Sequence, residues 1–478
     1  RHSFKKGESL SKQQRLTKGS AKLVSNTSEQ PPPQPALPEE ERQKREADKR
    51  KARKNNGAKR GIHYEMEQEE HDVYPDDPDF DINNARLVTI ATRICVRYEC
   101  VPMRFIKHVY KIHTYAQDGR LFEGKTPVSA FLNSSYDGSF IAGLMELRYI
   151  QSLPVERIIN YFESHGFTLK KPTAHKLMEK ASSLFENLYK CIRQTALSDP
   201  YKAADETYYK ILVPEKNSKG KGVRKGYLWV VVGINTRMIY LLYDDGSRSE
   251  KVILNELGGC KGIIQSDGYS PYRKLESDAY PHITRIPCLQ HIKRKFIDCG
   301  EDEPDAKRIV ELINTLYQNE HKHKIGVDGW TVEQNLVHRK KYAPDILGEI
   351  KDVLDDIEER GDLLPKSELK EAVTYLRNEW NAVVDIFNYG DTYLDNNIVE
   401  RMNRYISLSR KNSLFFGSHK GAERGAILYT IALTCRMNKV NLFEYLTDVI
   451  NRTAEWQPNT PLEKYRLLLP DRWEKAND

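Results

Sequence analysis

Hydrophobic positions follow different periods in successive stretches of the chain. Between residues 85 and 116 apolar and polar residues alternate, in ARLVTIATRICVRYECVPM and RFIKHVYKIHTYA. This alternation predicts a hairpin or small sheet that ends near Gly119. Residues 137–195 instead repeat every three to four positions, in SFIAGLMELRYIQS, LPVERIINYFESHGF and TAHKLMEKASSLFENLYKCIRQTAL. They predict helices interrupted at Gly166 and Pro172, which suits either a helix-turn-helix or a plain helical connector.

From Lys202 onward the pattern is that of alternating strands and helices. KAADETYYKILV predicts one strand, and YLWVVVGINTRMIYLLYDDG predicts two strands with a turn at Asn235-Thr236. Then follow a helix in SEKVILNELGG, a strand in KGIIQSDGY, a helix in PYRKLESD and a strand in HITRIPCLQH. Residues 292–393 are charged and helical, and residues 396–439 predict one or two further helices. This order predicts an α/β fold with a mixed sheet.

Composition limits the class of protein. A length of 478 residues with 39% hydrophobic residues allows about two to four domains and some solvated chain. No stretch reaches the roughly 18 consecutive apolar residues of a membrane span, and no signal-peptide core is visible. The seven cysteines are scattered, without a CxxC pair, which is typical of free thiols in a reducing compartment. We therefore expect a cytoplasmic, nucleoid-associated protein that does not bind a membrane.

The net positive charge is concentrated at the N-terminus. Residues 1–60 hold 17 Lys and Arg against 7 Asp and Glu, whereas the chain as a whole carries +7, so the remainder is slightly acidic. Pro, Lys, Arg and Ser dominate this segment, which predicts a disordered arm. A basic arm attracts nucleic acid without sequence specificity, although a solvated tail of no function has the same composition.

Two acids occupy informative places in the predicted sheet. Asp205 lies within the first strand, in AADETYY, and Asp267 lies at the end of the fourth, in IIQSDGYS. Ligands of open α/β sheets bind at such strand ends. If these two strands are neighbours, the carboxylates repel each other unless a cation such as Mg²⁺ lies between them. Glu400, at the start of a helix, is the candidate third ligand for a site that transfers phosphoryl groups on a nucleic-acid backbone.

The residues around Glu400 suit a phosphate-binding surface. Asn396 and Asn397 can cap the helix start. The neighbouring cations that can contact phosphates are Arg401, Arg404, Arg410 and Lys411. Arg404 shares a helix face with Glu400, so a surface salt bridge is the alternative interpretation of the same residues.

Four strings between residues 204 and 426 resemble a known family. ADET, QSDGYSPY, CLQHIKRKF and DNNIVERMNRYISLSRKNSLFFGSHKGAERGA closely resemble transposases of the insertion-sequence-66 family. The resemblance implies an RNase H-like core, similar to retroviral integrases, with an Asp-Asp-Glu triad. It assigns Asp205, Asp267 and Glu400 to that triad, with two Mg²⁺ or Mn²⁺ ions, and places a helical insertion between the second and third acids.

The same resemblance draws attention to a Cys-x-x-His step at Cys288 and His291. Cys288 and His291 are candidates for supporting the active site, where His291 could contact the substrate or order the site. An equal alternative is that His291 is a structural histidine in a tight turn. Lys293 and Arg294 follow as candidate DNA contacts. A zinc site here needs two further ligands that the sequence does not identify. The acidic stretch VYPDDPDFDINNA lacks the paired cysteines of the family's zinc module, so we expect the protein to bind no zinc.

Pattern and resemblance together predict a division of the chain. The expected segments are a disordered basic arm (1–62), a small β-rich module (63–120), a helical DNA-binding or connector domain (121–198), the first part of the RNase H-like core (199–296), a helical insertion (297–393), the last core helices (394–440) and a C-terminal helical tail (441–478).

The expected partner is double-stranded DNA, as the terminal inverted repeats of an element and as target. The loop NSKGKGVRKG supplies further candidate contacts, which are Lys219, Lys221, Arg224 and Lys225. A homodimer on paired ends and accessory proteins of the same element are expected. Two alternatives stay open: a DNA-binding protein without catalysis, such as a repressor or domesticated transposase, and a nuclease that cuts but does not join strands.

Overall fold

The computed structural model describes residues 103–109, 114–117, 120–123, 130–131, 134–216, 220, 222–361, 363–454, 456–457 and 459–475. The chain divides into two compact units, Arg1–Glu99 and Cys100–Asp478, and the first lies outside these residues. The expected basic arm (1–62) and most of the expected β-rich module (63–120) therefore also lie outside them.

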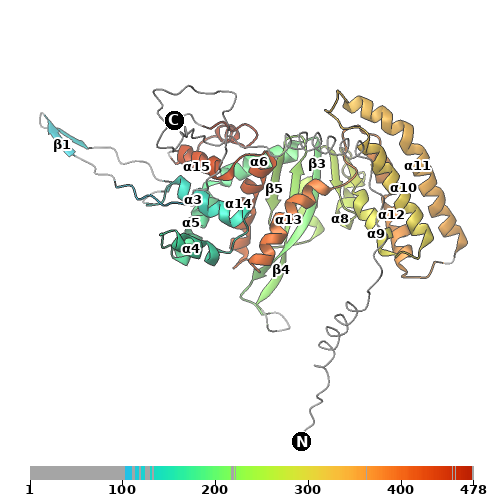
Figure 1. Ribbon diagram of the computed structural model, residues 1–478, viewed down its shortest axis with the longest axis horizontal. Coiled ribbons are helices and arrows are strands. Elements are labelled where there is room, and N and C mark those ends of the chain that lie inside the picture. The colour runs from blue at the N-terminus through green and yellow to red at the C-terminus, as the bar shows by residue number, and fades with distance from the viewer. Residues whose placement is uncertain are drawn as a thin grey trace, which may run out of the picture. The chain divides into compact units, whose positions relative to one another are not determined.

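A five-stranded mixed sheet forms the centre of the second unit, in the order β5-β4-β3-β6-β7 (Figure 1). Its strands are β3 (Tyr201–Leu212), β4 (Val223–Gly233), β5 (Met238–Leu242), β6 (Gly262–Ser266) and β7 (Ile283–Pro287). The first three pair antiparallel, whereas β6 and β7 run parallel to β3. The mixed α/β sheet expected from the sequence is confirmed.

The two neighbours of β3 cover it unequally. β4 pairs with the whole of β3, from Lys202 to Leu212, but β6 pairs only with Tyr201–Ala203. Beyond Ala203 this edge of β3 no longer pairs with β6. Near the other end of β3, Ile211 forms an isolated bridge with Phe416. The gap between these two contacts begins beside Asp205.

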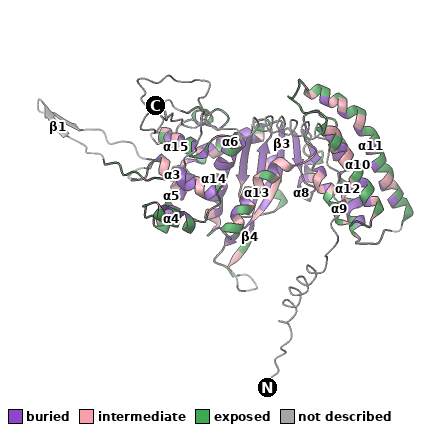
Figure 2. Ribbon diagram, in the orientation of Figure 1, coloured by how far each residue is buried: buried purple, intermediate pink, exposed green. Residues whose placement is uncertain are grey.

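Helices cover both faces of the sheet. On one face α13 (Asn397–Asn412) crosses β3 and β4 (Figure 1). α6 (Glu186–Ser198) and α14 (His419–Met437) pack on β5. On the Glu206 side, Tyr272 of α8 (Ser270–Arg273) packs edge-on against Trp229 of β4. Figure 2 shows that the strands between these layers are buried.

The helices before the sheet share its hydrophobic core. They are α3 (Gly138–Met145), the π-helical turn η3 (Glu146–Ile150), α4 (Val155–Ser164) and α5 (Lys171–Leu184), followed by α6. Ile141, Phe162 and Ile192 belong to the same buried cluster as Val231 of β4. α15 (Leu442–Thr453) packs on α3, and α16 (Leu462–Arg466) packs on α6.

A second cluster surrounds the other end of the sheet. It joins β7 to α9 (Leu289–Asp298), α10 (Pro304–His321), α11 (Val332–Arg360) and α12 (Glu368–Ile386). The helical pattern expected between residues 292 and 393 is therefore confirmed. α7 (Glu250–Leu257) and the 3₁₀ turn η4 (Lys274–Glu276) complete the connections around β6.

Some expected boundaries are wrong. Residues 103–109 form no strand; Phe105 instead packs against the rings of Phe140 and Phe162. The hairpin pairs β1 (Thr114–Gln117) with β2 (Arg120–Glu123), so it spans the expected module end at 120. The strand expected over 282–291 stops at Pro287 because proline lacks an amide donor, and α9 begins at Leu289.

Candidate active site

Asp205 lies on β3, and Asp267 follows the last residue of the adjacent parallel strand β6. The register of β3 with β6 pairs Tyr201 with Ile263 and Ala203 with Gln265. Extending the same offset by two residues brings Asp205 opposite Asp267, just past the end of β6. The expected neighbourhood of these two acids is present in the structure because β3 and β6 are adjacent strands.

Asp205 is held by two donors. The backbone N–H of Glu206 donates to Oδ1 at 2.8 Å, and Asn403 Nδ2 of α13 donates to Oδ2 at 2.6 Å. Burial, and then the negative charges of Glu206 and Asp267, raise the pKa of Asp205 to about 8, against the opposing effect of these donors. A cation between the acids would relieve both effects, so the carboxylate arrangement suits a divalent metal.

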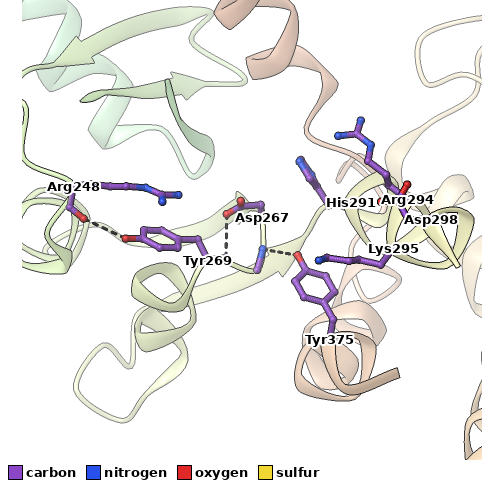
Figure 3. A pocket seen from close by; sticks show the side chains of 9 residues that line it. Arg248, Asp267, Tyr269, His291, Arg294, Lys295, Asp298 and Tyr375 are labelled. Atoms are coloured by element: carbon purple, nitrogen blue, oxygen red, sulfur yellow. Dashed lines mark hydrogen bonds between the residues drawn. The ribbon is translucent and has the colours of Figure 1, made fainter. Parts of the chain in front are cut away.

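The turn after β6 is fixed by a residue from a distant helix. Asp267 Oδ1 accepts from Tyr269 N at 3.1 Å, and Gly268 N donates to Tyr375 Oη of α12 at 2.9 Å. Figure 3 shows Tyr269 and Tyr375 on either side of Asp267. A Cβ atom at Gly268 would lie 2.5 Å from Tyr375 Oη, so only glycine fits under this ring.

Glu400 reaches the same region through α13. Asn396 Nδ2 donates to the carbonyl of Ala204 at 2.9 Å, immediately before Asp205 in the chain. Asn403, which binds Asp205, lies three residues after Glu400 and hence about one turn away. Within the described part of the chain, the partner within ion-pair distance of Glu400 is His291 and not Arg404. The alternative of a Glu400–Arg404 salt bridge is therefore wrong.

Asn396 does not act as expected. It occupies the N-cap position of α13, but its side chain makes no capping bond and binds β3 instead. Asn397 contributes its backbone N–H to Asp395 Oδ1 at 3.1 Å. The capping expected for Asn396 is therefore replaced by a tertiary contact that docks α13 beside Asp205.

Cys288 and His291 lie beside Glu400. Cys288 precedes α9, and its buried thiol accepts from the backbone N–H of Asn396 at 3.2 Å. One ligand atom from each of Cys288, His291 and Glu400 lies within 4.8 Å of the others. His291 Nδ1 and Glu400 Oε1 are both buried atoms without a hydrogen-bond partner. Among the residues that the structure describes, these three form a candidate metal-ligand set.

A polar cavity of about 260 Å³ opens beside Asp267 (Figure 3). Arg248, Arg294 and Lys295 provide its positive charge, and Tyr269 and Tyr375 provide aromatic walls. Arg248 also forms an ion pair with Glu206, whose pKa is raised by burial. The cavity combines cations with aromatic rings, as sites that hold a nucleic-acid strand do.

The expected DNA contacts fall into groups. Lys219 and Lys221 lie outside the described residues. Lys225 and Arg410 both stack on Tyr208, at 4.2 and 3.9 Å from the ring centroid, so their charges converge. The exposed cations on α13 and at the start of β4 are Arg401, Arg404, Lys411 and Arg224. Lys293 is half-buried on α9, and Arg294 lines the cavity.

Several residues of the site were not anticipated from the sequence. Asn403 had a signal, since it follows Glu400 at helical spacing, but nothing linked it to Asp205. Arg248, Tyr269 and Lys295 had only their polar or aromatic character. Tyr375 had no signal, because its helix meets the Asp267 turn only in the folded chain.

Comparison with known proteins identifies the family of the chain. A family model described as "Transposase IS66 family" matches residues 133–424. Three Sinorhizobium fredii proteins, each described as uncharacterized, are similar. The matches to y4jD, y4hP and y4qI are 25%, 23% and 25% identical, over 70%, 82% and 85% of this chain. They span 65%, 73% and 76% of those relatives. With most of the chain, including all three acids, inside the family match, the protein belongs to the IS66 family of transposases.

Proposed function

We propose that this protein is an RNase H-like Asp-Asp-Glu transposase that cuts element ends and joins them to target DNA. The observation that carries the proposal is the proximity of Asp205 on β3 to Asp267, just past the end of the adjacent parallel strand β6, where the charge of Asp267 helps to raise the pKa of Asp205. Asn403 adds the link from Asp205 to the helix that bears Glu400. In this proposal residues 199–296 and 394–440 form the core, and residues 297–393 form an insertion within it.

Two observations on Asp205 and Glu400 support the binding of a divalent metal. The pKa of Asp205 is raised by unrelieved burial and negative charge, and Glu400 Oε1 is a buried acceptor without a hydrogen-bond donor. Asp205, Asp267 and Glu400 would hold Mg²⁺ or Mn²⁺, with two ions expected. When bound, such ions activate an attacking oxygen and stabilise the leaving oxygen.

The protein's own groups position the reactants. Asn403 and the Glu206 amide orient Asp205, while Tyr375 holds the Asp267 turn. In cleavage, a water oxygen bonds to phosphorus as the bond from phosphorus to the 3′ oxygen breaks, and that oxygen leaves as a 3′-hydroxyl. In joining, the oxygen of this hydroxyl bonds to a target phosphorus as the target's bond from phosphorus to its 3′ oxygen breaks. That oxygen leaves as a 3′-hydroxyl on the target strand. Arg404 and Lys411, on the Glu400 side of α13, would contact the flanking phosphates.

The partners follow from this chemistry. The substrate would be double-stranded DNA, both as element ends and as target. Two protomers would act on paired ends, and proteins of the same element would assist. The exposed cations of α13 contribute a salt-dependent, non-specific share of affinity.

Strand cleavage and joining on element-end DNA with Mg²⁺ or Mn²⁺ test the proposal. Glu400→Gln keeps the shape of the side chain and removes its charge, so we expect cleavage to fall by at least about a hundredfold, as for loss of a key electrostatic group. DNA binding should persist. Glu311→Gln is the matched control, because Glu311 is exposed on α10, with 68% of its side chain accessible.

The other outcomes are equally informative. Binding without cleavage by the wild type, with the element's own proteins added, would favour a catalytically silent DNA-binding protein. Cleavage without joining would identify a nuclease. Equal cleavage by the wild type and Glu400→Gln would remove Glu400 from the triad.

A further inference from the structure

The arrangement of Cys288, His291 and Glu400 suits a softer cation than Mg²⁺. His291 Nδ1 lies 3.8 Å from Glu400 Oε1, which is too long for a hydrogen bond. Around a tetrahedral Zn²⁺, with bonds of about 2.0–2.2 Å to nitrogen and oxygen, two such donor atoms lie roughly 3.3–3.6 Å apart. Around an octahedral Mg²⁺ adjacent donors lie only about 2.9 Å apart. The observed separation is longer than both distances and nearer to the tetrahedral one, and a thiol is a ligand for soft and borderline metals.

The surroundings leave these donors available. The buried atoms His291 Nδ1 and Glu400 Oε1 have no hydrogen-bond partner, so no existing bond must break. The side chains of His291 and Glu400 are 28% and 32% exposed, which gives a cation access to the buried sulfur. His291 also lines the cavity beside Asp267, so a fourth position can take water.

We propose that Cys288, His291 and Glu400 form a site for a thiophilic divalent cation, with Zn²⁺ the best fit, and that filling it withdraws Glu400 from Asp205 and Asp267. The inhibition rests on the proposed function, because it requires that Glu400 take part in cleavage. The binding of the cation does not rest on it. The chain would then be switched off by a thiophilic metal through the carboxylate that Mg²⁺-dependent cleavage requires.

Binding requires the thiol to lose its proton. Burial raises the pKa of Cys288 to about 12, while the N–H groups of Asn396, His291 and Gln290 favour the thiolate. A cation that binds sulfur displaces this proton, so occupancy should rise with pH. This behaviour separates the site from a surface cluster of carboxylates, which is already ionised at neutral pH.

Cobalt(II) titration of the full chain tests binding without any activity assay. The wild type should show a sulfur-to-cobalt charge-transfer band in the near ultraviolet that Zn²⁺ abolishes. Cys288→Ser should lose this band, and Cys299→Ser should keep it. Cys299 is the matched control, since it is a free and more exposed thiol at the other end of α9. Absence of the band in the wild type, or its survival in Cys288→Ser, would overturn the site.

Because Cys288 is buried, Cys288→Ser could lose the band by misfolding. Two further variants therefore test the site at its other ligands. His291→Asn and Glu400→Gln change half-exposed side chains and should weaken Co²⁺ binding by about tenfold or more, since replacing a residue that only orients a metal ligand already costs this much. Circular dichroism checks that each variant is folded. Unchanged affinity in both variants would restrict the metal to a thiol alone and contradict the three-ligand site.

The inhibitory half is tested by cleavage in Mg²⁺ with rising Zn²⁺. Each variant is compared with its own zinc-free rate, and His291→Asn should need about tenfold more Zn²⁺ than wild type for half inhibition. If cobalt binds but Zn²⁺ does not slow cleavage, the proposed inhibition is wrong, and the proposed metal site stands. No cleavage by any form would count against the proposed transposase, while the cobalt spectrum would still decide the metal site.

Discussion

Asp205 is a carboxyl group in an unfavourable environment, and this makes the metal-free protein sensitive to pH. Its pKa is about 8 in the folded chain and near 4 when the chain is unfolded, so the folded state binds more protons between these values. The free energy of unfolding should therefore fall as pH rises from about 4 to about 8, and level off above that.

Replacing Asp205 with Asn tests this at the level of one residue. With EDTA present, Asp205→Asn should match the wild type near pH 4 and be more stable at pH 9 by at least about 1 kcal/mol, the equivalent of one unit of pKa difference. Urea unfolding at both pH values measures it. Mg²⁺ should stabilise only the wild type at pH 9. Parallel stability profiles for the two proteins would show that Asp205 is not strained by its surroundings.

At the scale of single elements, α12 sets the geometry of the Asp267 turn. Tyr375 accepts from Gly268 N, and Glu379 on the next turn of the same helix face pairs with Arg285 of β7. The helix that bears these residues thus contacts the core at both the turn and the adjacent strand. We regard Tyr375 as a positioning residue, because it would act on the proposed metal site through Asp267.

Tyr375→Phe removes the acceptor and keeps the ring. The Mg²⁺ concentration for half-maximal cleavage should rise about tenfold, the effect of roughly 1.5 kcal/mol from one lost hydrogen bond. The rate at saturating Mg²⁺ and the affinity for DNA should stay close to wild type. Tyr389→Phe is the matched control, since Tyr389 donates only a long bond of 3.4 Å to Thr284. Equal Mg²⁺ dependence in both variants would remove Tyr375 from this role.

At the scale of the whole molecule, a buried charge pair joins the helices α10–α12 to the sheet. The side chains of Arg285 and Glu379 are both fully buried, and Arg285 Nε also donates to Glu276 at 2.5 Å. Charges this deep are stable only while they are paired. The pair therefore holds α12 in one position against β7.

Replacing one residue of the Arg285–Glu379 pair should destabilise the protein more than replacing both. Glu379→Met should lower the free energy of unfolding by about 3–5 kcal/mol, because the buried Arg285 loses its buried partner and keeps only the partly exposed Glu276. Arg285→Met combined with Glu379→Met should recover most of this loss. Denaturant unfolding of both single variants and the double variant measures the coupling. Additive losses would show that the two side chains contribute independently.

The sequence alone determined much of the sheet. Apolar runs bounded by turns placed β3, β4, β5 and β6, because a strand between two helical layers is buried on both faces. It also singled out Asp205, Asp267 and Glu400. Boundaries failed where tertiary contacts decided them. A helix expected over residues 173–197 breaks at Phe185, and the alternation near Phe105 serves an aromatic cluster.

What only the tertiary structure decided is how these residues meet. Asn403 reaches Asp205, Tyr375 reaches Gly268, and Glu400 reaches Cys288 and His291, each from a segment distant in the chain. Such contacts depend on how whole helices pack on the sheet, and neither spacing nor composition encodes that packing locally. The chemical groups can therefore be identified from the sequence, whereas the proposal of a soft cation at Glu400 depends on distances that only the fold determines.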